Sequence, residues 1–151
     1  MIKEFRGKYR FLSNFWGSPF SYDGIRYPTN EHFYQAMKSY VPATRREIVK
    51  ASTPGKAKRL GGSIRSIRGD WEKIKVKVMY VGLKLKFENP ALAKKLKATF
   101  PKKLQEGNLW GDETWGVNLK TGAGQNLLGI LLMQIRTELI HHKTHRKKPH
   151  G

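Results

Sequence analysis

The apolar segment near the C-terminus places the strongest constraint on the fold. Between Gln125 and Leu139 the large aliphatic residues recur at the spacing of one helical face, at Leu127, Leu128, Leu131, Leu132, Ile135 and Leu139. Such a helix is stable in water only when its apolar face is covered. We therefore expect residues 125–139 to form the central core helix. The continuous apolar run, 127–133, is too short to span a bilayer.

An Asp-Gly pair predicts a hairpin in the N-terminal region. Apolar and polar residues alternate in Pro19–Tyr22 and in Ile25–Tyr27, on either side of Asp23 and Gly24. An Asp-Gly pair between two alternating segments is the strongest short-range signal for a two-residue hairpin turn. The sequence thus predicts a small antiparallel β ribbon.

Capping residues divide the rest of the chain into helices. Thr29 and Asn30 can cap a helix that runs to about Tyr40, Asp70 can cap a longer one, and proline at 54 and at 90 suits a first helical turn. Residues 71–87 also alternate as a strand would. The helices expected on these signals cover residues 30–40, 45–51, 55–62, 71–87 and 90–99. The sequence predicts an α+β, mostly helical fold, with a single domain over residues 1–140.

The first of these helices has two unlike sides. Its apolar side, which we expect to face the core, contains Phe33, Ala36, Met37 and Tyr40. A polar stripe of Glu31, Gln35 and Lys38 lies opposite, and periodicity alone favours a solvated surface there. Four carboxylates lack an evident structural task, namely Glu31, Glu106, Asp112 and Glu113. Glu31 stands in a first turn, where the helix dipole favours the ionised form.

The charge of the chain is strongly positive. The net charge is +19, with thirty Lys and Arg residues against eleven acids. Residues 141–151, which we expect to be a disordered basic tail rich in His and Lys, hold four of these cations and no acid. Most of the excess charge therefore belongs to residues 1–140. A surface of this kind attracts nucleic acid through counterion release. The alternative is a generic solubility surface, since charge alone specifies neither partner nor chemistry.

Nothing in the sequence calls for a metal or a cofactor. The chain has no cysteine, and outside the tail its single histidine is His32. Zinc sites need further histidines or cysteines at fixed spacing. The run Gly122–Leu127 begins like a dinucleotide fingerprint but has leucine in place of the third glycine. The N-terminus lacks the apolar stretch of a signal peptide, so we expect a cytoplasmic protein without a membrane segment.

Six ordered motifs resemble those of the NADAR (YbiA-like) family. They are Phe11–Phe15, Tyr27–Lys38, Ala57–Gly61, Arg68–Trp71, Trp115–Gly116 and Gly124–Gly129, and the match runs from about Phe11 to Arg136. The resemblance implies a mostly helical α+β fold and a hydrolase that cleaves N-glycosidic bonds without a metal. Family members remove ADP-ribose from guanine in nucleic acid, or act on ribosylaminopyrimidine phosphate intermediates of riboflavin biosynthesis.

The resemblance also implies roles for individual residues. Glu31 becomes the general acid/base candidate, and Lys38 becomes the amine that could form a Schiff base with a ring-opened ribose. The candidate substrate contacts are Asn14, Arg59, Trp71, Asp112, Trp115 and Asn126. The basic composition favours ADP-ribosylated nucleic acid as the substrate. The alternatives are the riboflavin intermediates and a non-catalytic module that binds ADP-ribose or nucleic acid.

Overall fold

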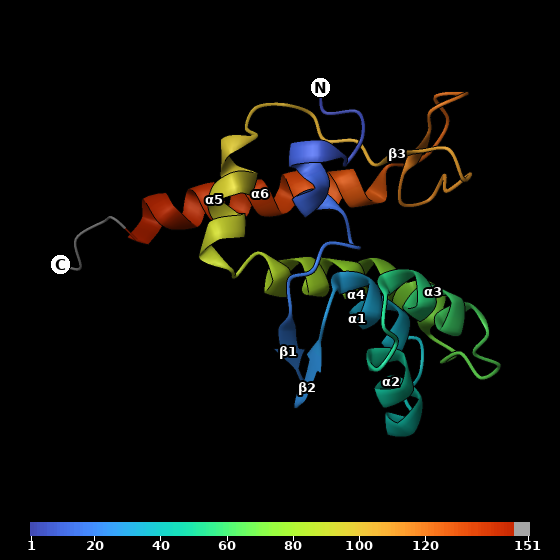
Figure 1. Cartoon of the computed structure of the whole chain (residues 1–151). Helices are drawn as coiled ribbons and strands as arrows, with labels where there is room; N and C mark the ends of the chain where they lie inside the picture. Colours follow the sequence, from blue (N-terminus) through green and yellow to red (C-terminus); the bar gives the residue numbers. More distant parts are fainter. Residues whose placement is uncertain (147–151) are drawn as a thin grey trace. The chain divides into compact units, whose positions relative to one another are not determined.

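The computed structural model describes residues 1–146, which group into two compact units (Figure 1). One unit is continuous and comprises residues 14–86, whereas the second unit combines residues 1–13 with residues 87–146. The chain therefore begins in the second unit, builds the unit of residues 14–86 and then returns to the second unit. The single domain expected over residues 1–140 stays a prediction.

The N-terminal hairpin is confirmed in the unit of residues 14–86. Strands β1 (Phe20–Tyr22) and β2 (Ile25–Tyr27) are antiparallel, with Phe20 opposite Tyr27. Asp23 and Gly24 between them both have positive φ, at 51° and 77°. Two central residues with positive φ are what a type I′ turn requires, and its twist matches that of the flanking strands.

Helix α1 (Asn30–Ala36) is the element around which this unit is built. It contacts α2 (Pro42–Val49), α3 (Pro54–Gly62) and α4 (Trp71–Lys86). All seven residues of α1 are buried. The expectation of a solvated polar stripe is therefore wrong for Glu31 and Gln35, because a neighbouring helix covers the side that periodicity assigned to water. Residues 71–86 are helical, which decides against the alternating strand pattern.

The end of α1 differs from the sequence prediction. The helix stops at Ala36, and Tyr40, which was expected to face the core, is 61% exposed. Because the chain turns after Ala36, helical periodicity no longer places Tyr40 beside Phe33. Tyr40 instead lies against Arg68, whose guanidinium carbon is 4.0 Å from the ring centroid. Arg68 also forms an ion pair with Asp70, the residue before α4, with 2.7 Å between Nε and Oδ1.

Glycine allows α3 to approach α1 closely. A Cβ atom built on Gly61 would lie 1.9 Å from Oε1 of Gln35, whereas a Cβ on the neighbouring Gly62 would meet no atom within 4 Å. The same holds for α4, where a Cβ on Gly82 would lie 1.9 Å from Oδ1 of Asn30. The absence of side chains at positions 61 and 82 thus sets the helix spacing around α1.

The second unit is built around α6 (Leu127–Arg146), which packs against α5 (Pro90–Ala98). Figure 1 shows these two helices crossing. The core helix predicted from the sequence is confirmed, since Leu128, Leu131, Leu132 and Ile135 are buried. The unit also contains the short helix η1 (Gly7–Leu12) and two parallel two-residue strands, β3 (Gly107–Asn108) and β4 (Val117–Asn118), in a region expected to be a loop.

Both ends of α6 differ from the prediction. The helix begins at Leu127 instead of Gln125, because Asn126 has a φ of 54° and so cannot continue a right-handed helix. At the other end it extends to Arg146, into the segment 141–151 that was expected to be disordered. The rest of that expectation falls on residues 147–151, outside the described residues. Among residues 1–146, no helix combines the length and the apolar character needed to cross a membrane.

Lys86, the last residue of α4, is fully buried despite its amine. Its side chain is 1% exposed, and burial lowers the pKa of Lys86 from 10.5 to about 7. A buried ammonium loses its hydration, so the neutral form is favoured in the folded chain. Lys86 therefore makes the stability of the protein depend on pH.

The effect of Gly61 on helix spacing can be tested with two neighbouring substitutions. Gly61→Ala should lower the free energy of unfolding by about 1–3 kcal/mol, the usual range for an overpacked core. Gly62→Ala should instead raise it by about 0.5–1 kcal/mol, because alanine favours the helix and meets no atom there. Urea unfolding of both variants measures the difference, and equal effects of the two substitutions would contradict the close approach.

Replacement of Lys86 tests the burial of its amine. Between pH 7 and 10.5 the unfolded chain binds the Lys86 proton and the folded chain does not, so stability should rise with pH by up to about 1.4 kcal/mol per unit. Lys86→Met lacks this contribution. The variant should be more stable than the wild type at pH 7, and the difference should narrow towards pH 10. The free energy of unfolding in urea is measured against pH for the wild type and for Lys86→Met. If the two proteins show the same dependence on pH, Lys86 keeps its proton in the folded chain.

Candidate active site on helix α1

The first turn of α1 holds Glu31 in a fixed position. Thr29 caps the helix, since its Oγ1 accepts a hydrogen bond of 3.1 Å from the backbone N–H of His32. The backbone N–H of Glu31 donates to the carbonyl oxygen of Asn14 at 3.1 Å. The ring nitrogens of His32 lie 2.7 Å from Oγ1 of Thr29 and 3.0 Å from the carbonyl oxygen of Ala51. This imidazole is therefore part of the packing.

The Glu31 carboxylate is buried and bonded to Gln35, one helical turn later. Only 7% of Glu31 is exposed, and Nε2 of Gln35 donates to its Oε2 at 2.6 Å. Oε1 of Gln35 has no hydrogen-bond partner among the described residues and abuts Gly61. The hydrogen bond fixes the direction of the carboxylate. The sequence placed Gln35 beside Glu31 but gave no sign that the pair would be buried.

Lys38 follows the end of α1 and lies beside aromatic rings. Its Nζ is 5.8 Å from the centroid of the Tyr34 ring, and that ring packs on Trp71 with 5.0 Å between centroids. Burial lowers the pKa of Lys38, Glu31 acts in the opposite direction, and Lys58 lowers it further. Desolvation thus outweighs the attraction of the nearby carboxylate, and the lowered pKa increases the neutral fraction of the amine, which is the direction that a nucleophilic lysine needs.

The arrangement brings together groups with complementary chemistry. A fixed carboxylate can accept or deliver a proton, and a partly desolvated amine can attack an electrophilic carbon. The rings of Tyr34 and Trp71 add an aromatic surface next to the amine. Tyr34 and Lys58 were not among the predicted site residues, although Tyr34 is one of the aromatic residues on which a base could stack. Tyr34 precedes Lys38 by four residues, whereas only the fold relates Lys58 to Lys38.

The other candidate contacts of this unit differ in character. Oδ1 of Asn14 accepts from Nδ2 of Asn30 at 2.8 Å, and its Nδ2 lies 3.4 Å from the sulfur of Met79. These contacts anchor the start of α1. Arg59 is exposed on α3, and Trp71 is buried against Tyr34. Trp71 therefore packs on the ring that lies beside Lys38, and Asn14 helps to fix the start of α1, while contacts of these residues with a substrate stay predictions.

Asp112, Trp115 and Asn126 belong to the second unit, where two of them organise the backbone. Oδ1 of Asp112 accepts hydrogen bonds from the N–H groups of residues 114 and 115. Asn126 accepts from the N–H of Glu106 and donates to the carbonyl of Leu104, both at 3.0 Å. Trp115 is half-buried. Contacts of these three residues with a substrate stay predictions.

Within residues 1–146, no group of three or more His, Asp or Glu side chains is placed to hold a metal ion.

Comparison with known proteins identifies the family. The N-glycosidase YbiA of Shigella flexneri is 41% identical over 133 residues, which cover 87% of this chain and 82% of that protein. A riboflavin biosynthesis protein of Vibrio vulnificus is 34% identical over 87% of this chain, but the match spans only 36% of that protein. The NMR structure of Escherichia coli YbiA superposes with a TM-score of 0.84 at 36% identity, covering 100% of this chain and 92% of the other. The model of the NADAR domain matches residues 2–140, and the chain belongs to this family.

Proposed function

We propose that this protein is an N-glycosidase that hydrolyses a bond between ribose and a nitrogen of a base. The observation that carries the proposal is the pairing of a buried, hydrogen-bonded Glu31 with a partly desolvated Lys38 at the two ends of α1. The similarity to proteins named N-glycosidase YbiA supports it. The reaction needs no metal or cofactor, because these two side chains supply the proton transfer and the nucleophile.

The chemistry starts from a sugar attached through an exocyclic nitrogen. Such a ribose can open, which leaves C1 as an imine. The neutral amine of Lys38 adds to C1. Glu31, acting as a carboxylate, carries the two amine protons in turn to the base nitrogen, so that the bond from C1 to that nitrogen breaks and the base leaves as its amine. Water then adds to the resulting Schiff base, Glu31 carries the protons of the water to the lysine nitrogen, and the sugar and the lysine amine are released. The net reaction consumes one water and yields a free sugar and a free base amine.

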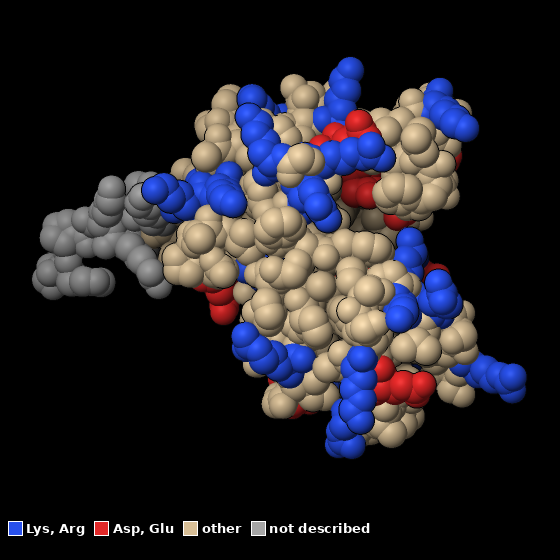
Figure 2. All heavy atoms as spheres, in the orientation of Figure 1, with Lys and Arg blue, Asp and Glu red and all other residues tan. Residues whose placement is uncertain are grey.

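The favoured substrate is ADP-ribosylated guanine in nucleic acid. The net charge of +19 favours a polyanion over a small neutral ligand. Figure 2 shows Lys and Arg side chains spread over the displayed surface, with far fewer acids. The partner in this proposal is nucleic acid, held through the basic surface, and the protein acts in the cytoplasm.

Two other functions compete with this one. Hydrolysis of ribosylaminopyrimidine phosphates is favoured by the similarity to the riboflavin biosynthesis protein of Vibrio vulnificus. A non-catalytic module that binds ADP-ribose or nucleic acid would explain the positive charge as well. That module would not need a buried carboxylate, however, since Glu31 repels the phosphates it would have to hold. Glu31 thus favours an enzyme.

A direct comparison of substrates tests the proposal. Purified protein is given ADP-ribosylated DNA and the ribosylaminopyrimidine phosphate in parallel, and sugar release is followed by mass spectrometry. We expect release from both or from one, with the higher kcat/KM on the DNA because the basic surface raises its local concentration. A higher kcat/KM on the pyrimidine would assign the riboflavin role. If neither substrate releases sugar, the N-glycosidase function is contradicted.

The same assay tests whether Glu31 takes part in the reaction. Glu31→Gln should lower kcat by about a hundredfold or more, the usual contribution of a general acid/base group. Glu72→Gln is the matched control, because Glu72 is 79% exposed on α4 and pairs only with Lys75 among the described residues. The control should keep the wild-type rate. Equal rates for the two variants would remove Glu31 from the mechanism.

A further inference from the structure

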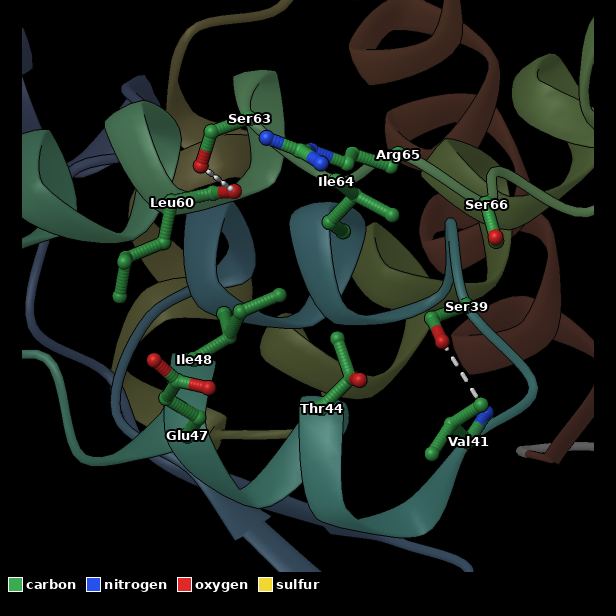
Figure 3. Close-up of a pocket in the computed structure, with 10 residues that line it drawn as sticks. All are labelled: Ser39, Val41, Thr44, Glu47, Ile48, Leu60, Ser63, Ile64, Arg65 and Ser66. Carbon is green, nitrogen blue, oxygen red and sulfur yellow. Dashed lines mark hydrogen bonds between the residues drawn. The ribbon is translucent and has the colours of Figure 1, made fainter.

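A pocket lies in the unit of residues 14–86, between α2 and α3 (Figure 3). Its volume is about 370 Å³, which is within the range of about 300–1,000 Å³ that is usual for small-molecule sites. One wall is aliphatic and consists of Val41, Ile48, Leu60 and Ile64. Hydroxyl groups of Ser39, Thr44, Ser63 and Ser66 line the remainder. We call this the α2–α3 pocket.

Two opposite charges face each other across the α2–α3 pocket. Glu47 stands on the α2 side and the guanidinium of Arg65 on the α3 side, with aliphatic side chains between them (Figure 3). Neither forms a hydrogen bond or an ion pair among the described residues, although Arg68 nearby is paired with Asp70. Both side chains are exposed, and the pocket lies between them.

The α2–α3 pocket is separate from the candidate active site. Helix α3 meets α1 through its buried residues Ala57 and Gly61. At about 100° per residue, Lys58 and Leu60 lie on opposite flanks of that contact. Lys58 is close enough to Lys38 to lower its pKa, whereas Leu60 lines the pocket. A ligand in the pocket would therefore not occupy the place of Lys38.

We propose that the α2–α3 pocket binds a guanine nucleotide, with the phosphate at Arg65 and the edge of the base at Glu47. Guanine carries two adjacent N–H donors, at N1 and at the exocyclic N2, and a carboxylate can accept from both. Adenine presents an acceptor beside its amino group, so a carboxylate there would face a lone pair. The aliphatic wall covers the face of the base, and the guanidinium matches the phosphate oxygens.

Isothermal titration of the full chain with GMP, AMP and inorganic phosphate tests this site. At about 0.15 M salt, where long-range attraction between exposed charges is screened, GMP should bind about tenfold or more tightly than AMP. That ratio is the usual order for a hydrogen-bonded contact to a charged group. Glu47→Gln should abolish the preference for GMP without weakening AMP, because removal of an acid alone favours any phosphate. Arg65→Gln should weaken all three ligands.

Matched variants separate this site from other modes of binding. Arg46→Gln removes an exposed cation of α2 that does not line the pocket, and it should leave all three affinities unchanged. Glu31→Gln should also keep the affinity for GMP, since Glu31 belongs to the other site. Loss of GMP binding in Glu31→Gln would assign the nucleotide to the candidate active site and overturn the proposal. The proposal would also be overturned if the wild type bound GMP and AMP equally, or if it did not bind GMP at millimolar concentration. It would be overturned as well if Glu47→Gln lost affinity for GMP and AMP to the same extent.

Discussion

Burial of α1 on every side is the constraint on which the unit of residues 14–86 depends. A helix of seven residues has little stability of its own and is held by its neighbours. Its polar residues must then find partners inside the protein. Gln35 supplies one for Glu31, and the carbonyl of Asn14 accepts the N–H of Glu31. Gly61 leaves room for the amide side chain of Gln35, and Gly82 leaves room for that of Asn30.

The same burial accounts for the chemistry of Lys38. A lysine next to a carboxylate would normally keep its proton, and a protonated amine is no nucleophile. The partial loss of hydration is the largest influence on the pKa of Lys38, and the charge of Lys58 acts in the same direction. Because the chain leaves the helix after Ala36, Lys38 stays beside Tyr34 without entering the core. Helix α1 and the turn that follows it thus hold a carboxylate and an amine in different surroundings.

Local signals in the sequence predicted much of the fold. The Asp-Gly turn, the Thr29 cap, the prolines at 54 and 90 and the apolar face of α6 act within a few residues, so they can be recognised without knowledge of the tertiary structure. The burial of Glu31 and Gln35 could not be predicted in this way. It results from α3, which is distant in the sequence and approaches because position 61 is glycine. The left-handed backbone of Asn126, which ends the preceding loop, is likewise held by bonds to Leu104 and Glu106.

The candidate site was predicted in part for a similar reason. Glu31 and Lys38 share one segment, so their proximity follows from the chain itself, and the influence of Glu31 on the pKa of Lys38 agrees with it. Asn14 lies further away in the sequence, and its side chain is engaged with Asn30 and Met79. Asn14 thus has a structural task, and its contact with a substrate stays a prediction. The sequence alone does not separate these two roles.

In the proposed reaction the amine of Lys38 forms a covalent bond to the sugar. Borohydride added during turnover should trap this bond, because it reduces a Schiff base to a stable secondary amine. The intact mass of the protein should increase by that of the reduced sugar, on a peptide containing Lys38, and Lys38→Arg should give no adduct and little activity. An unchanged intact mass after reduction, together with an active Lys38→Arg variant, would contradict it.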